Sequence, residues 1–225
     1  MQLVKFIVPV LTSLLLVTPA AAKSKLLLTV ADISNSSLLT VDSAYAGRVA
    51  NVVIDKIVPM KAGDQVRFRT LGAYDAKENN SIVFNSTISN RDRPKLIASR
   101  LGRYVASFPT LISSGKIKAG GSTHIIDTLV ELSPTLDCEA QDTTIQVLTD
   151  GLETSGDGTK FNEKKGTITL PTYGAGEFKG CHLEMYGIGK LSKNSNARLT
   201  RALRTAWTKW AKSAGFKSVR LFSNW

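Results

Sequence analysis

Five residues whose side chains carry oxygen atoms follow apolar stretches of this sequence, and these oxygens are suitable ligands for a metal ion. They are Asp32, Ser34, Ser36, Thr123 and Asp150. The first three alternate along one loop, so their side chains can turn toward a single point. Two carboxylates and three hydroxyls form an all-oxygen set, which suits an octahedral hard cation such as Mg²⁺ or Mn²⁺. Such a cation usually keeps bound waters, which leaves a position that a carboxylate from another molecule can fill.

Each of these residues also has an ordinary structural interpretation. Ser36 or Ser37 can serve as the N-cap of a following helix, and Asp150-Gly151 can form a plain turn. These alternatives leave the residues independent of one another, whereas a metal site requires all five to meet. The two interpretations are therefore distinguished by whether the fold brings the five side chains together.

Few residues of this chain are of the types that form catalytic sites. The sequence has two histidines, His124 and His182, which are too few for an all-histidine zinc site. His124 could be a ligand or a donor to a ligand, but hard cations prefer oxygen, so an ordinary loop residue is favoured. Asp127 and Glu131 are interpreted as solvated acids of a helix. The candidate serines lack a convincing base, and no Gly-x-Ser-x-Gly sequence is present, so we expect a protein that is not an enzyme.

The elements that must position these ligands alternate between strand and helix. The apolar runs at 26–31 and 143–149 are typical of strands covered on both faces. Further strands are expected at 65–71, 81–89, 166–170, 181–187 and 217–222, and helices at 38–57, 95–112, 125–132 and 197–214. The order predicts an α/β fold with a doubly wound, mostly parallel six-stranded sheet flanked by helices. The carboxyl ends of parallel strands share one edge, where ligands bind.

In this context the chain resembles a von Willebrand factor A-type (vWA) domain over most of residues 25–225. The metal-ion-dependent adhesion site (MIDAS) of that family combines a D-x-S-x-S motif after the first strand, a threonine in a later loop and an aspartate after the fourth strand. Here the three pieces are DISNS, GGST and LTDG, in the same order. D-x-S-x-S alone is a weak motif, whereas the three pieces in the correct structural context are much more specific.

The resemblance implies a Rossmann-like vWA fold and a role for each ligand. Ser34, Ser36 and Thr123 would ligate the metal directly, while Asp32 and Asp150 would act mainly through bound waters. Members of the family typically use this metal to bind an acidic residue of a protein partner. The chain departs from the family at Asn35, where a glycine is common, and in the long segment 152–179, which is expected to be a loop or hairpin insertion.

The N-terminal segment and the cysteines indicate the compartment. Residues 1–22 combine Lys5, an apolar run and three alanines, which predicts a signal peptide and a mature single domain over 23–225. The alternative is an uncleaved membrane anchor. Export to the periplasm or the medium makes a Cys138–Cys181 disulfide the expectation, the alternative being two buried free thiols.

The charge distribution supplies a second candidate surface. The net charge is +11, and residues 190–225 contain nine Lys or Arg and no acid. On the helix expected at 197–214 one arc carries Arg198, Arg201, Arg204, Lys209 and Lys212, while Trp207 and Trp210 fall on the apolar arc and are expected in the core. The basic arc is either a solvated face or a surface for anionic lipid, nucleic acid or an acidic protein.

Two functions remain open from the sequence. The favoured one is a metal-dependent protein-binding module, for adhesion or assembly, in the cell envelope of a bacterium. The alternative is an envelope component that binds a polyanion through its basic helix and has a vestigial metal site. Sensitivity of partner binding to chelators or to salt distinguishes them.

Overall fold

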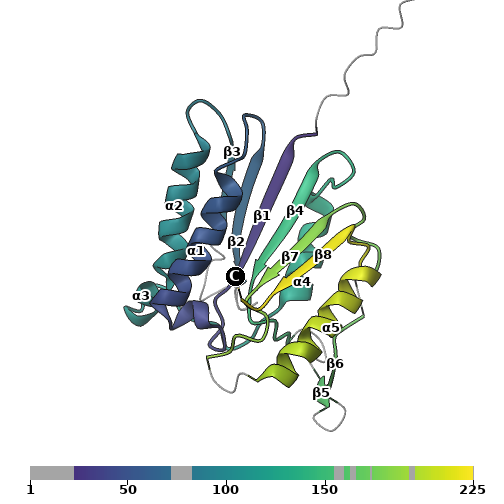
Figure 1. Ribbon diagram of the computed structural model, residues 1–225. Helices are drawn as coiled ribbons and strands as arrows, with labels where there is room; N and C mark the ends of the chain where they lie inside the picture. Colours follow the sequence, from purple (N-terminus) through teal and green to yellow (C-terminus); the bar gives the residue numbers. More distant parts are fainter. Residues whose placement is uncertain are drawn as a thin grey trace, which may run out of the picture.

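The computed structural model describes residues 23–71, 83–154, 160–162, 166–172, 174–192 and 196–224. A six-stranded sheet in the order β3-β2-β1-β4-β7-β8 runs through the centre of the molecule (Figure 1). Its strands are β1 (Lys25–Asp32), β2 (Gln65–Leu71), β3 (Val83–Thr87), β4 (Asp142–Leu148), β7 (His182–Tyr186) and β8 (Ser218–Phe222). All neighbours are parallel except β2 and β3, which are antiparallel. The predicted mostly parallel α/β fold is confirmed.

Helices cover both faces of this sheet (Figure 1). One face carries α1 (Ser43–Ile57), α2 (Pro94–Ala106) and α3 (Phe108–Ser113), and the other carries α4 (Ile125–Leu132) and α5 (Ala197–Ser213). Two short 3₁₀ helices, η1 (Leu38–Thr40) and η2 (Ser133–Thr135), lie in the connections. Because both faces are covered, every residue of β1 after the first is buried.

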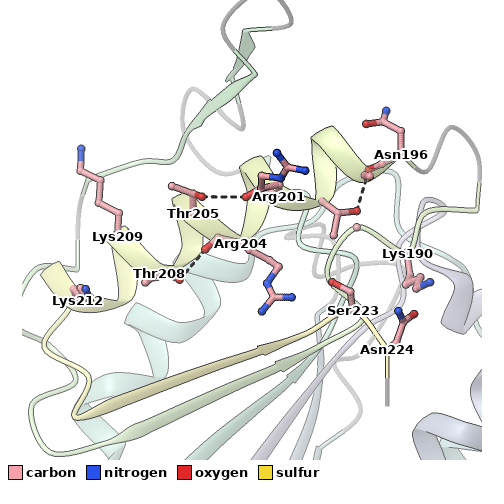
Figure 2. A pocket seen from close by; sticks show the side chains of 13 residues that line it. Lys190, Asn196, Arg201, Arg204, Thr205, Thr208, Lys209, Lys212, Ser223 and Asn224 are labelled. Carbon is pink, nitrogen blue, oxygen red and sulfur yellow. Dashed lines mark hydrogen bonds between the residues drawn. The ribbon is translucent and has the colours of Figure 1, made fainter.

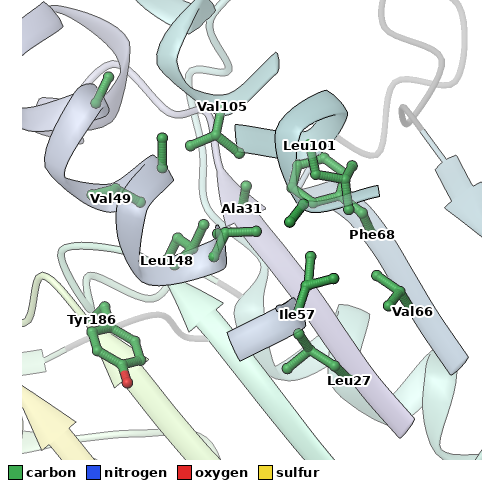
Figure 3. Packing of buried hydrophobic residues seen from close by; sticks show 14 of the residues in the cluster. Leu27, Ala31, Val49, Ile57, Val66, Phe68, Leu101, Val105, Leu148 and Tyr186 are labelled. Carbon is green, nitrogen blue, oxygen red and sulfur yellow. The ribbon is translucent and has the colours of Figure 1, made fainter. Parts of the chain in front are cut away.

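The core under α1 and α2 is built from the apolar faces of both helices and of four strands (Figure 3). The labelled side chains are Leu27, Ala31, Val49, Ile57, Val66, Phe68, Leu101, Val105, Leu148 and Tyr186. Full burial of a side chain of this size contributes roughly 1.5–3 kcal/mol. This packing holds β1 rigidly beside β4, and the loops after these two strands carry the candidate ligands.

The opposite core places the tryptophans of α5 against the sheet. Trp207 and Trp210 are 0% and 4% exposed, so their predicted place in the core is confirmed. The Trp207 Nε1–H also donates a 2.8 Å hydrogen bond to the carbonyl of Gly151. Gly151 has φ +85°, a conformation that residues with a side chain rarely adopt, and a β-carbon there would also lie 2.8 Å from the end of the Ile188 side chain, so the position favours glycine. The buried face of α5 thereby fixes the loop that follows β4.

Two expected helices differ from the structure at their boundaries. The helix predicted at 38–57 is divided into η1 and α1, because the Asp42 side chain accepts a 2.9 Å hydrogen bond from Tyr45 N–H and starts a new helix. The helix predicted at 95–112 ends at Ala106, and α3 begins one residue after Ser107, with Pro109 in its first turn. Proline lacks the N–H that a continuous helix would require at that position.

The segment 152–179 contains a small ladder that the sequence indicated only in part. β5 (Lys160–Asn162) pairs antiparallel with β6 (Thr167–Thr169) in a separate two-stranded sheet. β6 contacts α5, and both lie at the same side of the molecule in Figure 1. Only the second strand was expected, because the first has no apolar alternation to mark it.

A disulfide joins Cys138 to Cys181, with their α-carbons 5.0 Å apart, and this confirms the predicted pair. It ties the segment before β4 to the start of β7, at the amino-terminal edge of the sheet. Among the described residues, no helix has both the length and the apolar character needed to cross a bilayer. The predicted signal peptide, 1–22, lies outside the described residues.

Candidate metal centre

The two candidate carboxylates lie at the same edge of the sheet. Asp32 is the last residue of β1, and Asp150 follows the end of β4 by two residues. Since β1 and β4 are adjacent and parallel, both side chains reach the carboxyl edge of the sheet side by side. They are 0% and 1% exposed. Two buried carboxylates at close range are costly unless a proton or a cation compensates their charge.

Asp32 has a hydrogen-bond partner for each of its oxygens. Oδ1 accepts from Ser34 N–H at 2.8 Å, and Oδ2 accepts from the Thr149 hydroxyl at 2.8 Å. Burial raises the pKa of Asp32, and these hydrogen bonds lower it in part. Both oxygens are thus held in place, which suits a carboxylate that acts on a metal through water.

Asp150 has one oxygen with a partner and one without. Oδ1 accepts from Leu152 N–H at 2.8 Å, whereas Oδ2 is buried and has no hydrogen-bond partner among the described residues. Burial first, and the negative charge of Asp32 second, raise the pKa of Asp150 to about 7, while the Ser36 hydroxyl and the Leu152 N–H lower it. A buried carboxylate oxygen without a donor is rare in folded proteins and indicates a missing polar partner.

The serines of the DISNS loop are not helix caps. Ser37 is the N-cap of η1, its hydroxyl accepting from Leu39 N–H at 3.3 Å, and Asp42 caps α1. The hydroxyls of Ser34 and Ser36 instead approach each other to 3.1 Å. Neighbouring ligands of an octahedral Mg²⁺ at 2.0–2.1 Å are separated by about 3 Å, so this pair has the spacing of two adjacent ligands.

The loop that contains GGST is held against the DISNS loop by backbone hydrogen bonds. Gly120 N–H donates to the Ile33 carbonyl at 3.0 Å, and Asn35 N–H donates to the Gly120 carbonyl at 2.9 Å. Thr123, three residues further, lines an open cavity of about 500 Å³ together with Ser34 and Ser36. The fold therefore brings the three predicted hydroxyls to one cavity, with the two carboxylates buried beside it.

Several supporting residues were missed in the sequence analysis. Thr154 holds Thr123, accepting from its N–H at 2.7 Å and donating its own N–H to the Thr123 carbonyl at 2.7 Å. The buried Glu153 accepts from Ile126 N–H at 2.6 Å and so anchors the start of α4. Thr149 holds Asp32, as described above. Only Thr149 carried a sequence signal, a hydroxyl residue directly before Asp150 at the end of a buried strand.

His124, the N-cap of α4, contacts one residue of that helix and one of the loop before it. Its Nδ1 lies 3.3 Å from Asp127 Oδ2, and its Nε2 lies 3.1 Å from the Ser122 hydroxyl. Glu131 lies 3.7 Å from Arg69. No group of three or more His, Cys, Asp or Glu side chains in the described ranges could hold a metal ion. The candidate centre is of a different kind, since it has two carboxylates and three hydroxyls.

The structure separates one of the five predicted basic residues from the rest. Arg201, Arg204, Lys209 and Lys212 line an open groove of about 990 Å³ beside α5 (Figure 2). Arg198 does not line it. Its side chain lies against Gly166, where an added β-carbon would be 2.6 Å from the Arg198 Nε.

Comparisons with known proteins find matches among solved structures only. No protein-family model matches the sequence, and no curated protein matches it. The pilus adhesin SpaC from Lactobacillus rhamnosus GG matches with 13% identity and a TM-score of 0.48, over 88% of this chain and 28% of that one. The human COPII-coat protein Sec24c matches with 9% identity and a TM-score of 0.45, over 90% of this chain and 30% of that one. This chain thus spans less than a third of either protein.

Proposed function

We propose that this protein is a non-enzymatic, metal-dependent protein-binding module of the bacterial cell envelope, for adhesion or assembly, with a vWA-type MIDAS. The observation that carries the proposal is the buried Oδ2 of Asp150, which has no hydrogen-bond partner among the described residues. A metal-bound water would donate the missing hydrogen bond, and the cation would compensate the charge that raises the pKa of Asp150.

The residues at this edge fit Mg²⁺ or Mn²⁺. Ser34, Ser36 and Thr123 line one cavity and would hold the cation directly. Asp32 and Asp150 are buried and would hold it through water. When bound, the cation supplies a positive centre at an open cavity, where a carboxylate of a protein partner can complete its coordination.

The disulfide supports the assignment to the envelope. Disulfides persist in oxidising compartments, which in bacteria are the periplasm and the medium. Cys181 is fully buried, and Cys138 is partly buried. The bond is therefore a structural one, and we propose a periplasmic or secreted location on this basis together with the predicted signal peptide.

Calorimetric titration with Mg²⁺ and with Mn²⁺ tests the metal directly. The wild-type protein is expected to bind one ion, and Asp150→Ala is expected to bind none. Asp55→Ala is the matched control, because Asp55 is an exposed carboxylate on α1 away from the sheet edge. Unchanged affinity in Asp150→Ala would overturn the metal assignment.

Capture of envelope proteins on the immobilised protein tests the role of the metal in binding. We expect a specific protein to be retained in Mg²⁺, released by EDTA, and not retained by Asp150→Ala. Retention of the same protein in EDTA contradicts a metal-dependent contact.

A further inference from the structure

The groove beside α5 concentrates positive charge at one surface. Its cationic side chains are Lys190, Arg201, Arg204, Lys209 and Lys212, and no Asp or Glu is among the described residues that line it. Arg204 points from α5 toward the end of β8, where Ser223 and Asn224 form the opposite wall, while Lys209 points away from that wall (Figure 2). The groove therefore presents cations along the exposed side of a 17-residue helix.

The described part of the protein does not neutralise these cations. Within the described part of the chain, none of the five side chains forms an ion pair. Other basic residues of the same fold are paired: Lys56 and Arg220 both contact the buried carboxylate of Glu184. Unpaired like charges repel one another, so the groove gains stability when an anionic chain occupies it.

Three threonine hydroxyls of the groove favour a ligand that can donate hydrogen bonds. Thr200, Thr205 and Thr208 each donate their hydroxyl hydrogen to a helix carbonyl four residues earlier, at 3.0, 3.1 and 2.7 Å (Figure 2). Their oxygens can then only accept hydrogen bonds from a ligand. A phosphodiester backbone brings acceptors alone, whereas an acidic peptide brings carboxylates for the Arg and Lys side chains and backbone N–H donors for the threonines.

The lining disfavours nucleic acid bases and lipid. Single-stranded nucleic acids bind through aromatic side chains that stack on the bases, and membrane-surface helices insert large apolar side chains. Among the described residues that line the groove, Ala197 is the only one with an apolar side chain, and the tryptophans of α5 are buried. A polar, cationic trough with acceptor hydroxyls fits an extended acidic peptide best.

The groove is continuous in the chain with the candidate metal centre. Gly189 and Lys190 line the groove, and the next two residues, Leu191 and Ser192, line the metal-site cavity. Ser192 N–H donates to the Ser36 carbonyl at 2.9 Å, and Gly189 N–H donates to the Asp150 carbonyl at 2.7 Å. One extended ligand can therefore contact both sites across this loop.

We propose that the groove between α5 and the end of β8 binds an extended acidic segment of the protein partner. This inference rests on the proposed function, because it assigns the segment to the partner whose carboxylate binds the metal. The groove supplies affinity through charge, and the acceptor hydroxyls select a peptide over a phosphate polymer. Its 17-residue helix is about 25 Å long, which matches about eight residues of extended chain.

The test uses a fluorescent peptide of about eight residues rich in Asp and Glu, matched to the length of α5. Its anisotropy is measured with wild-type protein, Arg201→Glu/Arg204→Glu and Arg100→Glu/Arg103→Glu. The last pair is the matched control, since Arg100 and Arg103 are exposed at the same spacing on α2. We expect the first pair to weaken binding at least about tenfold, and the control to change it less than about threefold through the general field alone.

A second comparison tests the choice of ligand. Thr205→Val/Thr208→Val is expected to weaken peptide binding, and Thr205→Ser/Thr208→Ser to preserve it, because only the serine pair keeps the acceptor oxygens. Single-stranded DNA and vesicles containing phosphatidylglycerol are titrated in parallel. If either binds more tightly than the peptide and loses binding in Arg201→Glu/Arg204→Glu, the groove is a phosphate site and the inference is wrong.

Chelation separates this inference from the proposed function. Suppose that the peptide still binds in EDTA but does not bind Arg201→Glu/Arg204→Glu. This result supports the groove and contradicts a role of the metal in holding this peptide. Binding that is lost in EDTA but unchanged in that pair overturns the groove and leaves the metal proposal standing. Equal losses in both arginine pairs overturn the groove as a specific site.

Discussion

Replacing one buried carboxylate is expected to stabilise the metal-free protein at high pH. Burial and the charge of Asp32 raise the pKa of Asp150 from 3.8 to about 7. Between these values the unfolded chain releases the proton that the folded chain retains, so the free energy of unfolding falls as the pH rises. At about 1.4 kcal/mol per pH unit, the full penalty above pH 7 is about 4 kcal/mol. Asp150→Asn removes this penalty, because an amide does not ionise.

The expected gain is about 2–4 kcal/mol near pH 8, since the introduced amide must find an acceptor where Oδ2 now has no partner. Near pH 5 only the first of these pH units, about 1.2, have been crossed, so the penalty is about 1.6 kcal/mol and the expected gain is correspondingly smaller. The Leu152 N–H keeps its acceptor in the variant, because Oδ1 is retained. The loop after β4 should therefore hold its position.

Urea denaturation in EDTA across this pH range is the assay, with Asp55→Asn as the control for loss of one exposed carboxylate. The reasoning is refuted if Asp150→Asn is no more stable than wild type near pH 8, or if the difference between them does not grow with pH. Addition of Mg²⁺ at about 100 times its dissociation constant should then stabilise wild type by about 2.7 kcal/mol and leave Asp150→Asn unchanged.

Three further perturbations test other parts of the structure. Cys138→Ser with Cys181→Ser opens a 43-residue loop and should cost about 4 kcal/mol of unfolding free energy, measured by denaturation; an unchanged midpoint would contradict a stabilising bond. Thr123→Ala should weaken binding of the captured partner by more than it weakens Mg²⁺ affinity, because the hydroxyl tunes the attraction of the cation for its outside ligand; equal losses in binding and calorimetric assays would refute this. Trp207→Ala should cost about 3–5 kcal/mol through the cavity it leaves, and Trp207→Phe should lose mainly the hydrogen bond to Gly151, which thermal unfolding of both would separate.

The mostly parallel sheet and the shared edge of Asp32 and Asp150 were predictable from the sequence. Continuous apolar runs marked β1 and β4, and polar residues at the ends of adjacent parallel strands must share an edge. That rule brought Asp32 and Asp150 together without any knowledge of their contacts. It applies because a helix between two strands returns the chain so that both strands run in the same direction, which the order of elements along the sequence indicates.

The contacts that support the site were not predictable in the same way. Glu153 anchors α4 and Thr154 holds Thr123 across long stretches of sequence, and no periodic pattern records such pairings. Similarly, the helical arc placed Arg198 with the other basic residues, but β6 packs beside α5 and the Arg198 side chain lies at Gly166. Helical spacing gives the angle of a side chain around its axis, whereas the neighbour on that side depends on the tertiary fold.

The hydrogen bond from Trp207 to Gly151 makes α5 a mechanical link between the two proposed sites. The buried side of this helix holds the residue next to Asp150, and its exposed side forms the wall of the groove. A ligand that shifts the helix would therefore pull on Gly151, the residue beside Asp150. By thermodynamic reciprocity, any factor by which an acidic peptide raises Mg²⁺ affinity is the factor by which Mg²⁺ raises affinity for the peptide. Where that factor is large, the protein would bind a partner tightly only when both the cation and the acidic segment are present.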